Sequence, residues 1–171
     1  MINGDYLGMD LTLDDFDLEN RAFFAHLANG ELRLQRCPEN GMMRYPPATR
    51  CPYSGSAEAE WVQVDAVGSV YSYTEVHHAI QPAFKAHTPY MVLMVELDVQ
   101  RGQPTEHDGI RMMGNLVTPD GEMAPPDLVA SVGIGTRVRM VFKKIGDQMA
   151  LPCWTVDETA DQPEIWRYPQ E

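Results

Sequence analysis

Residues 59–77, with the sequence AEWVQVDAVGSVYSYTEVH, decide the fold class of this chain. Valine, tyrosine and tryptophan dominate the segment, and Gly68 divides it into two runs. Runs rich in β-branched and aromatic residues are typical of strands. The segment therefore predicts that the chain has a strong β character from this point onward.

Four more segments with strand character follow. Residues 90–99, YMVLMVELDV, form a nearly continuous apolar run, which predicts a central strand buried on both faces. Residues 136–145, TRVRMVFKKI, alternate instead, so Val138 and Met140 should face inward while Arg137 faces solvent. The other two segments are IRMMGNLV at residues 110–117 and MALPCWTV at residues 149–156.

The connections between these segments are polar and rich in turn-forming residues, as at residues 101–109 and 118–127. No helical pattern falls between the predicted strands. About five strands joined in this way argue for a small antiparallel barrel or sandwich. A mainly β fold with a five-stranded barrel of the oligonucleotide/oligosaccharide-binding (OB) type fits the strand count.

The N-terminal part has a different pattern. Residues 1–15 show no clear apolar face, so we expect an extended or partly disordered segment. The sequence LENRAFFAHLANG, from residue 18, places Phe23, Phe24 and Leu27 on one face of a short amphipathic helix that an Asn-Gly pair ends. This face packs either on the protein's own body or on a partner subunit.

Residues 36–55, RCPENGMMRYPPATRCPYSG, contain two similar turns that open with Cys-Pro and close on Gly. A zinc ribbon has a second cysteine three residues after each first one. Here Asn40 stands at that spacing from Cys37, and a serine, Ser54, stands at that spacing after the other cysteine, Cys51. Structural zinc needs four ligands, and neutral Asn and Ser oxygens replace thiolate poorly. We therefore expect no zinc, no other cofactor and a ribbon that is kept as a shape.

Taken in order, these segments resemble the DUF35 family, which joins a rubredoxin-like zinc ribbon to an OB-fold barrel. The strings that carry the resemblance include RYPP at residues 44–47, GSVYSYTEVH at 68–77 and LPCWTV at 151–156. The resemblance covers residues 18–156. We expect four parts, which are an N-terminal segment with the short helix (1–30), a degenerate zinc ribbon (31–58), the OB-fold barrel (59–156) and a C-terminal tail (157–171).

The resemblance also implies a function. Members of this family are accessory proteins of acyl-CoA metabolism, and they bind thiolases, hydroxymethylglutaryl-CoA synthases or lipid-transfer-protein type aldolases. The partner enzyme carries the chemistry, so we expect no catalytic residue in this chain. The DUF35 subunit stabilises its partner and helps to hold the CoA part of the substrate.

Two sets of contact residues follow as predictions. The partner-binding candidates lie on the helix and the ribbon, and they are Phe23, Phe24, Leu27, Met42, Tyr45 and Tyr53. The CoA-binding candidates lie along and after the YSYTEVHH strand, and they are Tyr73, His77 and Phe84.

Two other functions stay open. In the first, the isolated chain binds acyl-CoA or acts as an enzyme, with His77 or His78 as acid or base. Adjacent residues of a strand point to opposite faces, so at most one of these two rings enters a given site. In the second, the barrel binds single-stranded nucleic acid. The net charge of −12 and the lack of a basic groove disfavour this second function.

Length and composition are consistent with an ordinary folded protein. The 171 residues suffice for one domain with a small appendage. No apolar run reaches the roughly 18 residues of a membrane span, so we expect no membrane partner. The acidic N-terminus is not a signal peptide, and the three cysteines fit a reducing compartment. The cytoplasm is therefore the expected location.

Overall fold

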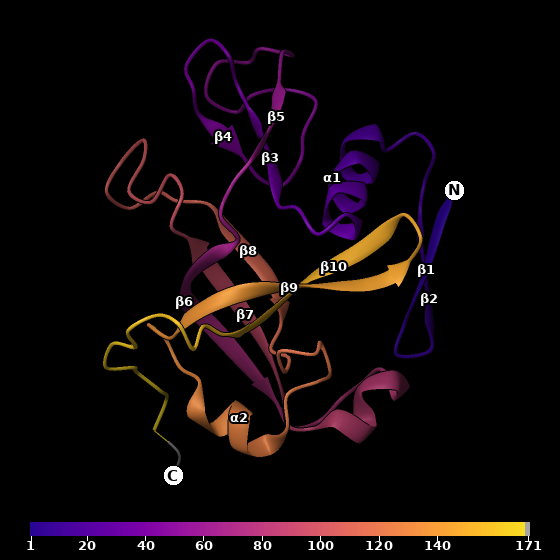
Figure 1. The fold of residues 1–171 in the computed structure, drawn as a ribbon, viewed down its shortest axis with the longest axis vertical. Coiled ribbons are helices and arrows are strands. Elements are labelled where there is room, and N and C mark those ends of the chain that lie inside the picture. The colour runs from indigo at the N-terminus through magenta and orange to yellow at the C-terminus, as the bar shows by residue number, and fades with distance from the viewer. Residues whose placement is uncertain (170–171) are drawn as a thin grey trace. The chain divides into compact units, whose positions relative to one another are not determined.

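The computed structural model describes residues 1–169, which form two compact units (Figure 1). Unit 1 contains residues 1–66, 99–110 and 142–151, and unit 2 contains residues 67–98, 111–141 and those from 152 onward. Each unit thus draws on segments that are far apart in the sequence. The four-part division expected above stays a prediction. No helix in residues 1–169 has the length and hydrophobicity needed to cross a lipid bilayer.

The largest sheet has five strands in the order β10-β9-β6-β7-β8 (Figure 1). The strands are β6 (Val67–Val76), β7 (Tyr90–Leu97), β8 (Arg111–Asn115), β9 (Arg137–Gly146) and β10 (Met149–Val156). β6 pairs antiparallel with β7 and with β9, and β7 pairs antiparallel with β8. This arrangement confirms the predicted mainly β fold and its five strands.

Contacts between the β8 end and β10 join the two edges of the sheet within unit 2. Leu116, which follows β8, forms a parallel bridge with Trp154 on β10, and the Val117 amide donates a 2.8 Å hydrogen bond to the Trp154 carbonyl. A Cβ at Gly114 would lie only 2.1 Å from the Pro152 carbonyl oxygen. Glycine is therefore required where these two backbones meet.

The strand β7 shows how the core of unit 2 forms. Met91, Leu93, Val95 and Leu97 are fully buried, whereas the residues between them are half-buried. The prediction that this strand is buried on both faces is wrong, because its second face is only partly covered. The alternation predicted for β9 is confirmed at its start, where Val138 is fully buried.

Two short helices lie between strands, so the expectation of strands without intervening helices is wrong. The 3-10 helix η1 (Pro82–His87) lies between β6 and β7, and α2 (Pro126–Ser131) lies between β8 and β9. Each has six residues, which is too few to show a helical period in the sequence.

Unit 1 begins with a hairpin that the sequence did not indicate. β1 (Ile2–Tyr6) pairs antiparallel with β2 (Met9–Leu13) through a turn at Leu7 and Gly8, whose φ angles are 55° and 80°. Two successive positive φ angles are typical of the tight turns that fit a twisted hairpin. Of the two states expected for residues 1–15, the extended one is confirmed by these strands, whereas partial disorder is wrong here, since Ile2 and Tyr6 are buried.

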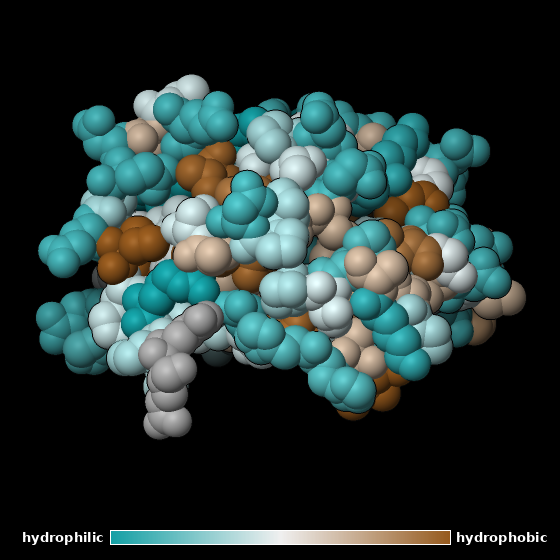
Figure 2. Space-filling model, turned by 90° about the horizontal axis from the view of Figure 1, so that it is seen from below, coloured by the Kyte–Doolittle hydropathy of each residue, from teal (hydrophilic) through white to brown (hydrophobic). Residues whose placement is uncertain are grey.

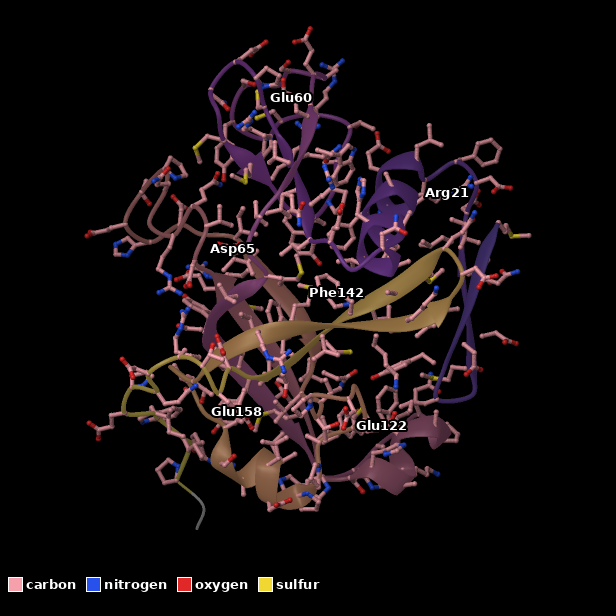
Figure 3. The ribbon with its side chains drawn as sticks, in the orientation of Figure 1. Arg21, Glu60, Asp65, Glu122, Phe142 and Glu158 are labelled. Atoms are coloured by element: carbon pink, nitrogen blue, oxygen red, sulfur yellow. The ribbon has the colours of Figure 1, made fainter. Side chains whose placement is uncertain are left out.

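The predicted helix is confirmed as α1 (Leu18–Ala28). The carboxylate of Asp17 accepts a 3.1 Å hydrogen bond from the Asn20 amide and so caps the N-terminus. Gly30, with φ of 77°, follows the C-terminal end. Arg21, labelled in Figure 3, lies on α1 and pairs with Asp15 at 3.1 Å.

The ribbon of unit 1 has a small sheet in the order β4-β3-β5. Its strands are β3 (Arg33–Arg36), β4 (Met43–Arg44) and β5 (Glu60–Gln63). Glu60, labelled in Figure 3, pairs with Arg36 on β3 at 2.7 Å. The side chain of Gln100 makes hydrogen bonds of 2.7 and 2.9 Å with the backbone of Met43, which ties the segment 99–110 to β4.

Backbone also meets backbone between β1 and the end of β9, within unit 1. A Cβ at Gly4 would lie 2.8 Å from the Ile145 side chain, and one at Gly146 would lie 2.5 Å from the Asn3 carbonyl oxygen. Any side chain at either glycine would therefore push the N-terminal hairpin away from residues 145–146.

Candidate functional site

The two turns of the ribbon have the same geometry. The Gly41 amide donates a 2.8 Å hydrogen bond to the Cys37 carbonyl, and the Gly55 amide donates one of the same length to the Cys51 carbonyl. Both glycines have positive φ angles, of 72° and 75°. The backbone of both turns therefore has the same shape, and the positive φ angles account for the glycine at each position.

The structure brings the four ligand positions of the ribbon together. The Ser54 hydroxyl lies 3.4 Å from the Cys37 sulfur, and its side chain also bonds to the Cys51 sulfur. The Asn40 side-chain amide points its nitrogen at the Cys51 sulfur from 3.8 Å. Hydrogen bonds between side chains thus link the two turns where a metal ion would otherwise link them.

These hydrogen bonds change the acidity of one thiol. Burial raises the pKa of Cys51, but hydrogen bonds from the Ser54 hydroxyl, the Tyr53 and Ser54 backbone and the Asn40 side chain together outweigh burial and lower the pKa to about 6. A thiolate accepts such hydrogen bonds more strongly than a thiol does.

The ribbon residues do not fit a zinc ion. Tetrahedral zinc needs a lone pair from each of four ligands, and Asn40 presents N–H groups to the sulfur instead. Both polar side chains also serve the turns, since the Met42 amide donates to Asn40 at 2.9 Å and the Ser56 amide donates to Ser54 at 3.3 Å. Within residues 1–169, no group of three or more His, Cys, Asp or Glu residues could hold a metal.

The helix face packs on the protein's own body, which was one of the two alternatives. Phe23 and Leu27 are 2% and 0% exposed, and the Phe23 ring lies 5.6 Å from that of Tyr45. A partner could reach these two side chains only if they left this core. Their burial therefore argues against direct partner contact by Phe23 and Leu27.

The other four partner-binding candidates offer surface. Phe24, Met42 and Tyr45 are half-buried, and Tyr53 is 48% exposed. Tyr53 follows Cys51 within the second turn of the ribbon. The structure thus leaves a small set of accessible apolar side chains on unit 1, and their role stays a prediction.

Two of the three CoA-binding candidates line one pocket in unit 2. Tyr73 and His77 border a pocket of about 370 Å³ together with Glu75, Arg167 and residues 168–169. Phe84 does not line this pocket, and its ring packs on Tyr90 at 4.9 Å. The structure therefore brings Tyr73 and His77 together but not Phe84.

Glu75 is the charged centre of this pocket. One of its oxygens lies 3.3 Å from the His77 ring nitrogen and the other lies 2.8 Å from the Arg167 guanidinium. Arg167 also donates to the carbonyls of Val129 and Val132, which fixes the position of its side chain. A carboxylate beside an imidazole can orient it for proton transfer, but here the same carboxylate is also neutralised by arginine.

Arg167 was not among the predicted site residues, because it lies in a segment predicted to be a tail. The Trp166 amide and carbonyl pair with those of Ile134 at 2.9 and 2.8 Å, and this pairing holds the segment in place. The Tyr168 amide donates to the Tyr73 hydroxyl at 2.8 Å. Only contacts across long sequence separations define this side of the pocket, so no local pattern could have indicated it.

The two candidate catalytic histidines are exposed, and both follow the end of β6. His77 contacts Glu75 as described, whereas His78 does not line the pocket. On the face shown in Figure 2, hydrophobic residues form several small patches that hydrophilic residues separate. Trp166 and Tyr168 add exposed aromatic surface near the pocket in unit 2, and their rings lie 6.3 Å apart.

Comparison with known proteins relates this geometry to a family. The model of the ChsH2 C-terminal OB-fold domain matches residues 61–143. The chain is also 35% identical over 99 residues to a probable enoyl-CoA hydratase alpha subunit of Thermomonospora curvata. That match covers 58% of this chain and 28% of the relative, so the chain spans less than a third of the relative's length.

Solved structures give longer matches. A chain of the Ltp2–ChsH2(DUF35) aldolase is 29% identical, with a TM-score of 0.64, and the match covers 84% of this chain and 98% of that one. A DUF35 protein of unknown function from Sulfolobus solfataricus is 14% identical, with a TM-score of 0.52 over 82% of this chain and 87% of its own, and supports the fold alone. Together with the five-stranded sheet, these matches support the predicted membership of this chain in the DUF35 family.

Proposed function

We propose that this chain is a non-catalytic accessory subunit that binds and stabilises a thiolase-like enzyme acting on an acyl-CoA. The observation that carries the proposal is the likeness to the ChsH2(DUF35) aldolase chain, which extends over 98% of that chain. The match also covers 84% of this chain, which supports a role like that of the matched chain.

The partner-binding surface of the proposal is the accessible part of unit 1. It comprises Phe24, Met42, Tyr45 and Tyr53, which are half-buried or exposed. Aromatic and methionine side chains of this kind are enriched at the centres of protein interfaces. The ribbon shape would then serve docking, which accounts for its persistence without a full set of metal ligands.

The proposed substrate of the partner enzyme is an acyl-CoA. The curated relative's description as an enoyl-CoA hydratase subunit supports a CoA ester as the substrate class. The pocket beside Tyr73 and His77 in unit 2 would hold part of the CoA, with Arg167 as the cation nearest to a phosphate. Glu75 already neutralises this arginine, so the pocket alone should bind CoA weakly.

Native co-purification tests the function. The tagged chain is purified from its own cells at low salt, and mass spectrometry identifies every protein that remains bound in stoichiometric amount. A thiolase-fold enzyme is the expected partner, and its acyl-CoA activity should fall when the subunit is removed and return when it is added back. A chain that purifies alone, with no enzyme whose activity depends on it, would overturn the proposal.

Single substitutions test the surface. Tyr53→Ala should weaken the complex by more than about 1 kcal/mol, which is at least about fivefold in the dissociation constant, if Tyr53 is a buried anchor. Met113→Ala is the matched control, because Met113 is 56% exposed but lies on β8 in unit 2. Equal affinities for the two variants would remove Tyr53 from the proposed surface.

A second candidate function rests on the contact between His77 and Glu75. If the isolated chain acts on an acyl-CoA, the His77→Ala variant should lose that activity while its thermal stability stays unchanged. Turnover by the isolated chain that depends on His77 would favour this function over the accessory role. Turnover that His77→Ala leaves intact would exclude His77 as the acid or base.

A further inference from the structure

Arg44 is a buried cation without an anionic partner among the described residues. Only 4% of it is exposed, and it forms no ion pair within residues 1–169. Its Nε donates hydrogen bonds of 3.1 Å to the Gln35 side chain and to the Ala48 carbonyl. Its Nη1 is buried and has no hydrogen-bond partner. Part of the guanidinium fork therefore lacks the compensation that a buried charge requires.

The residues around Arg44 fix the orientation of its side chain. Gln35, only 5% exposed, holds the guanidinium from one side, and its oxygen also accepts from the Ala48 amide at 2.8 Å. Gln35 and Arg44 are register partners on β3 and β4. The orientation of the arginine is thus set by the ribbon sheet and its next turn, before any ligand arrives.

A pocket of about 240 Å³ lies at Arg44, entirely within unit 1. Its walls come from α1 and the ribbon. Ala22, Ala57, Ala59 and Trp61 supply apolar surface, but Gln35, Thr49 and the charged residues make the lining more polar than apolar overall. Glu19 also borders the pocket, but it lies beyond salt-bridge distance of Arg44. A small cavity with one fixed cation, other polar groups and a few apolar side chains suits a short ligand with an anionic head.

The charges of the pocket select among anions. A guanidinium presents paired donors that match the two oxygens of a carboxylate or of a phosphate. Glu19 adds a negative charge at the same pocket, so a ligand with two negative charges would be repelled more than one with a single charge. A carboxylate, which carries one charge at neutral pH, fits this balance better than a phosphate dianion.

We infer that this pocket is a carboxylate-binding site in which Arg44 receives the carboxylate. The carboxylate comes either from a free short-chain acid or from an acidic side chain of a bound protein. The inference depends on Arg44, Gln35 and the pocket alone. Its test is therefore independent of the accessory-subunit proposal.

Nuclear magnetic resonance on the full ¹⁵N-labelled chain tests the site. The side-chain Nε–H signal of Arg44, assigned by its loss in Arg44→Lys, is followed during titration with sodium propionate at constant ionic strength. A saturable shift of this signal is expected. Arg44→Lys should weaken propionate binding at least about tenfold, measured on backbone amides of the pocket, because lysine lacks the planar fork.

Glu19→Gln is the matched variant with the opposite expected effect. Removing the competing charge should tighten propionate binding about two- to fivefold, in line with the strength of exposed charge pairs. A purely structural role of Arg44 would leave the affinity insensitive to Glu19. Signals that never saturate, or equal affinities in all three proteins, would overturn the inference. So would a loss of stability in Glu19→Gln without acid binding, since Glu19 would then be the partner of Arg44.

Two further probes distinguish the source of the carboxylate. Butyrate and hexanoate should bind progressively tighter than propionate, by about fourfold per methylene, if the apolar side chains of the pocket receive a free acid. Glutamate blocked at both backbone ends should bind tighter than propionate if the site receives a protein side chain. Each pattern supports the site and names its ligand.

Discussion

The barrel strands of unit 2 and the ribbon of unit 1 keep their shapes in different ways. β7 buries every second side chain, and its partners β6 and β8 continue the same hydrophobic core. The ribbon strands are only two to four residues long, and four small side chains link its turns. Core packing stabilises unit 2 through many side chains, whereas hydrogen bonds among Cys37, Asn40, Cys51 and Ser54 link the two turns of the ribbon.

This difference explains what each region tolerates. A packed core loses stability whenever volume changes, so its pattern stays visible in the sequence. The ribbon backbone depends on turn glycines and on local hydrogen bonds, and these survive when the ligand residues change. The ribbon turns can therefore keep their backbone shape without a bound metal ion.

The helix anchor should show the largest effect of the variants considered. Phe23→Ala should lower the free energy of unfolding by about 3–5 kcal/mol, as is usual for truncating a buried aromatic ring. Phe24→Ala is the control on the same helix, and its half-buried ring should cost clearly less. Chemical denaturation followed by tryptophan fluorescence measures both. Equal losses would contradict the assignment of Phe23 to the core of unit 1.

Restoring the missing ligands should convert the ribbon into a metal site. In the double variant Asn40→Cys with Ser54→Cys, four thiolates occupy the two turns, so one zinc ion should bind per chain. At a free zinc concentration about 100-fold above the dissociation constant, the stability gain should be about 2.7 kcal/mol. Calorimetric melting with zinc and with a chelator measures this gain. A double variant that melts at the same temperature in both would show that the four positions do not converge.

Substitution of one glycine in each region compares the stability of the barrel with that of the ribbon. Gly114→Ala should cost about 1–3 kcal/mol or more, because its Cβ would overlap the Pro152 carbonyl and backbone would have to move. Gly41→Ala has open space around its Cβ, so only its φ of 72° matters, at about 1–2 kcal/mol. Thermal unfolding ranks the two variants. A larger loss for Gly41→Ala would mean that the approach between β8 and β10 is not close.

A pH dependence located in the ribbon tests its hydrogen bonds separately. The pKa of Cys51 is about 6 in the folded chain instead of 9.0, so the unfolded chain binds the proton first as pH falls. The stability that Cys51 contributes is full above pH 9.0 and is lost as pH falls toward 6. The stability difference between the wild type and Cys51→Ala should therefore shrink over this range. A difference that does not change with pH would contradict the hydrogen-bonded thiolate.

Sequence patterns predicted the helices and strands that are long enough to show a periodic pattern of apolar residues. The helix α1 and the strands of the large sheet were predictable from alternation and spacing. The N-terminal hairpin was not, because it has five-residue strands and few buried residues. Helices of six residues were missed for the same reason.

The site residues also include some that the sequence predicted and some that it did not. Side chains that are close in sequence, such as Tyr73 and His77, were predictable as neighbours on a strand and its end. Arg44 and Arg167 were missed as functional candidates, since their importance depends on burial and on acceptors that lie elsewhere in the chain. Sequence patterns show which residues are charged, but not which charges lack a partner after folding.

The contact of β1 with residues 145–146 has a consequence for the order of folding. Gly4 and Gly146 allow the first strand to rest on the end of β9, and both belong to unit 1. During synthesis the first strand therefore leaves the ribosome long before its final support does. Until that support is made, the hairpin has only its own turn and strand pairing to stabilise it. Nascent chains shorter than about residue 146 should expose it to chaperones and proteases.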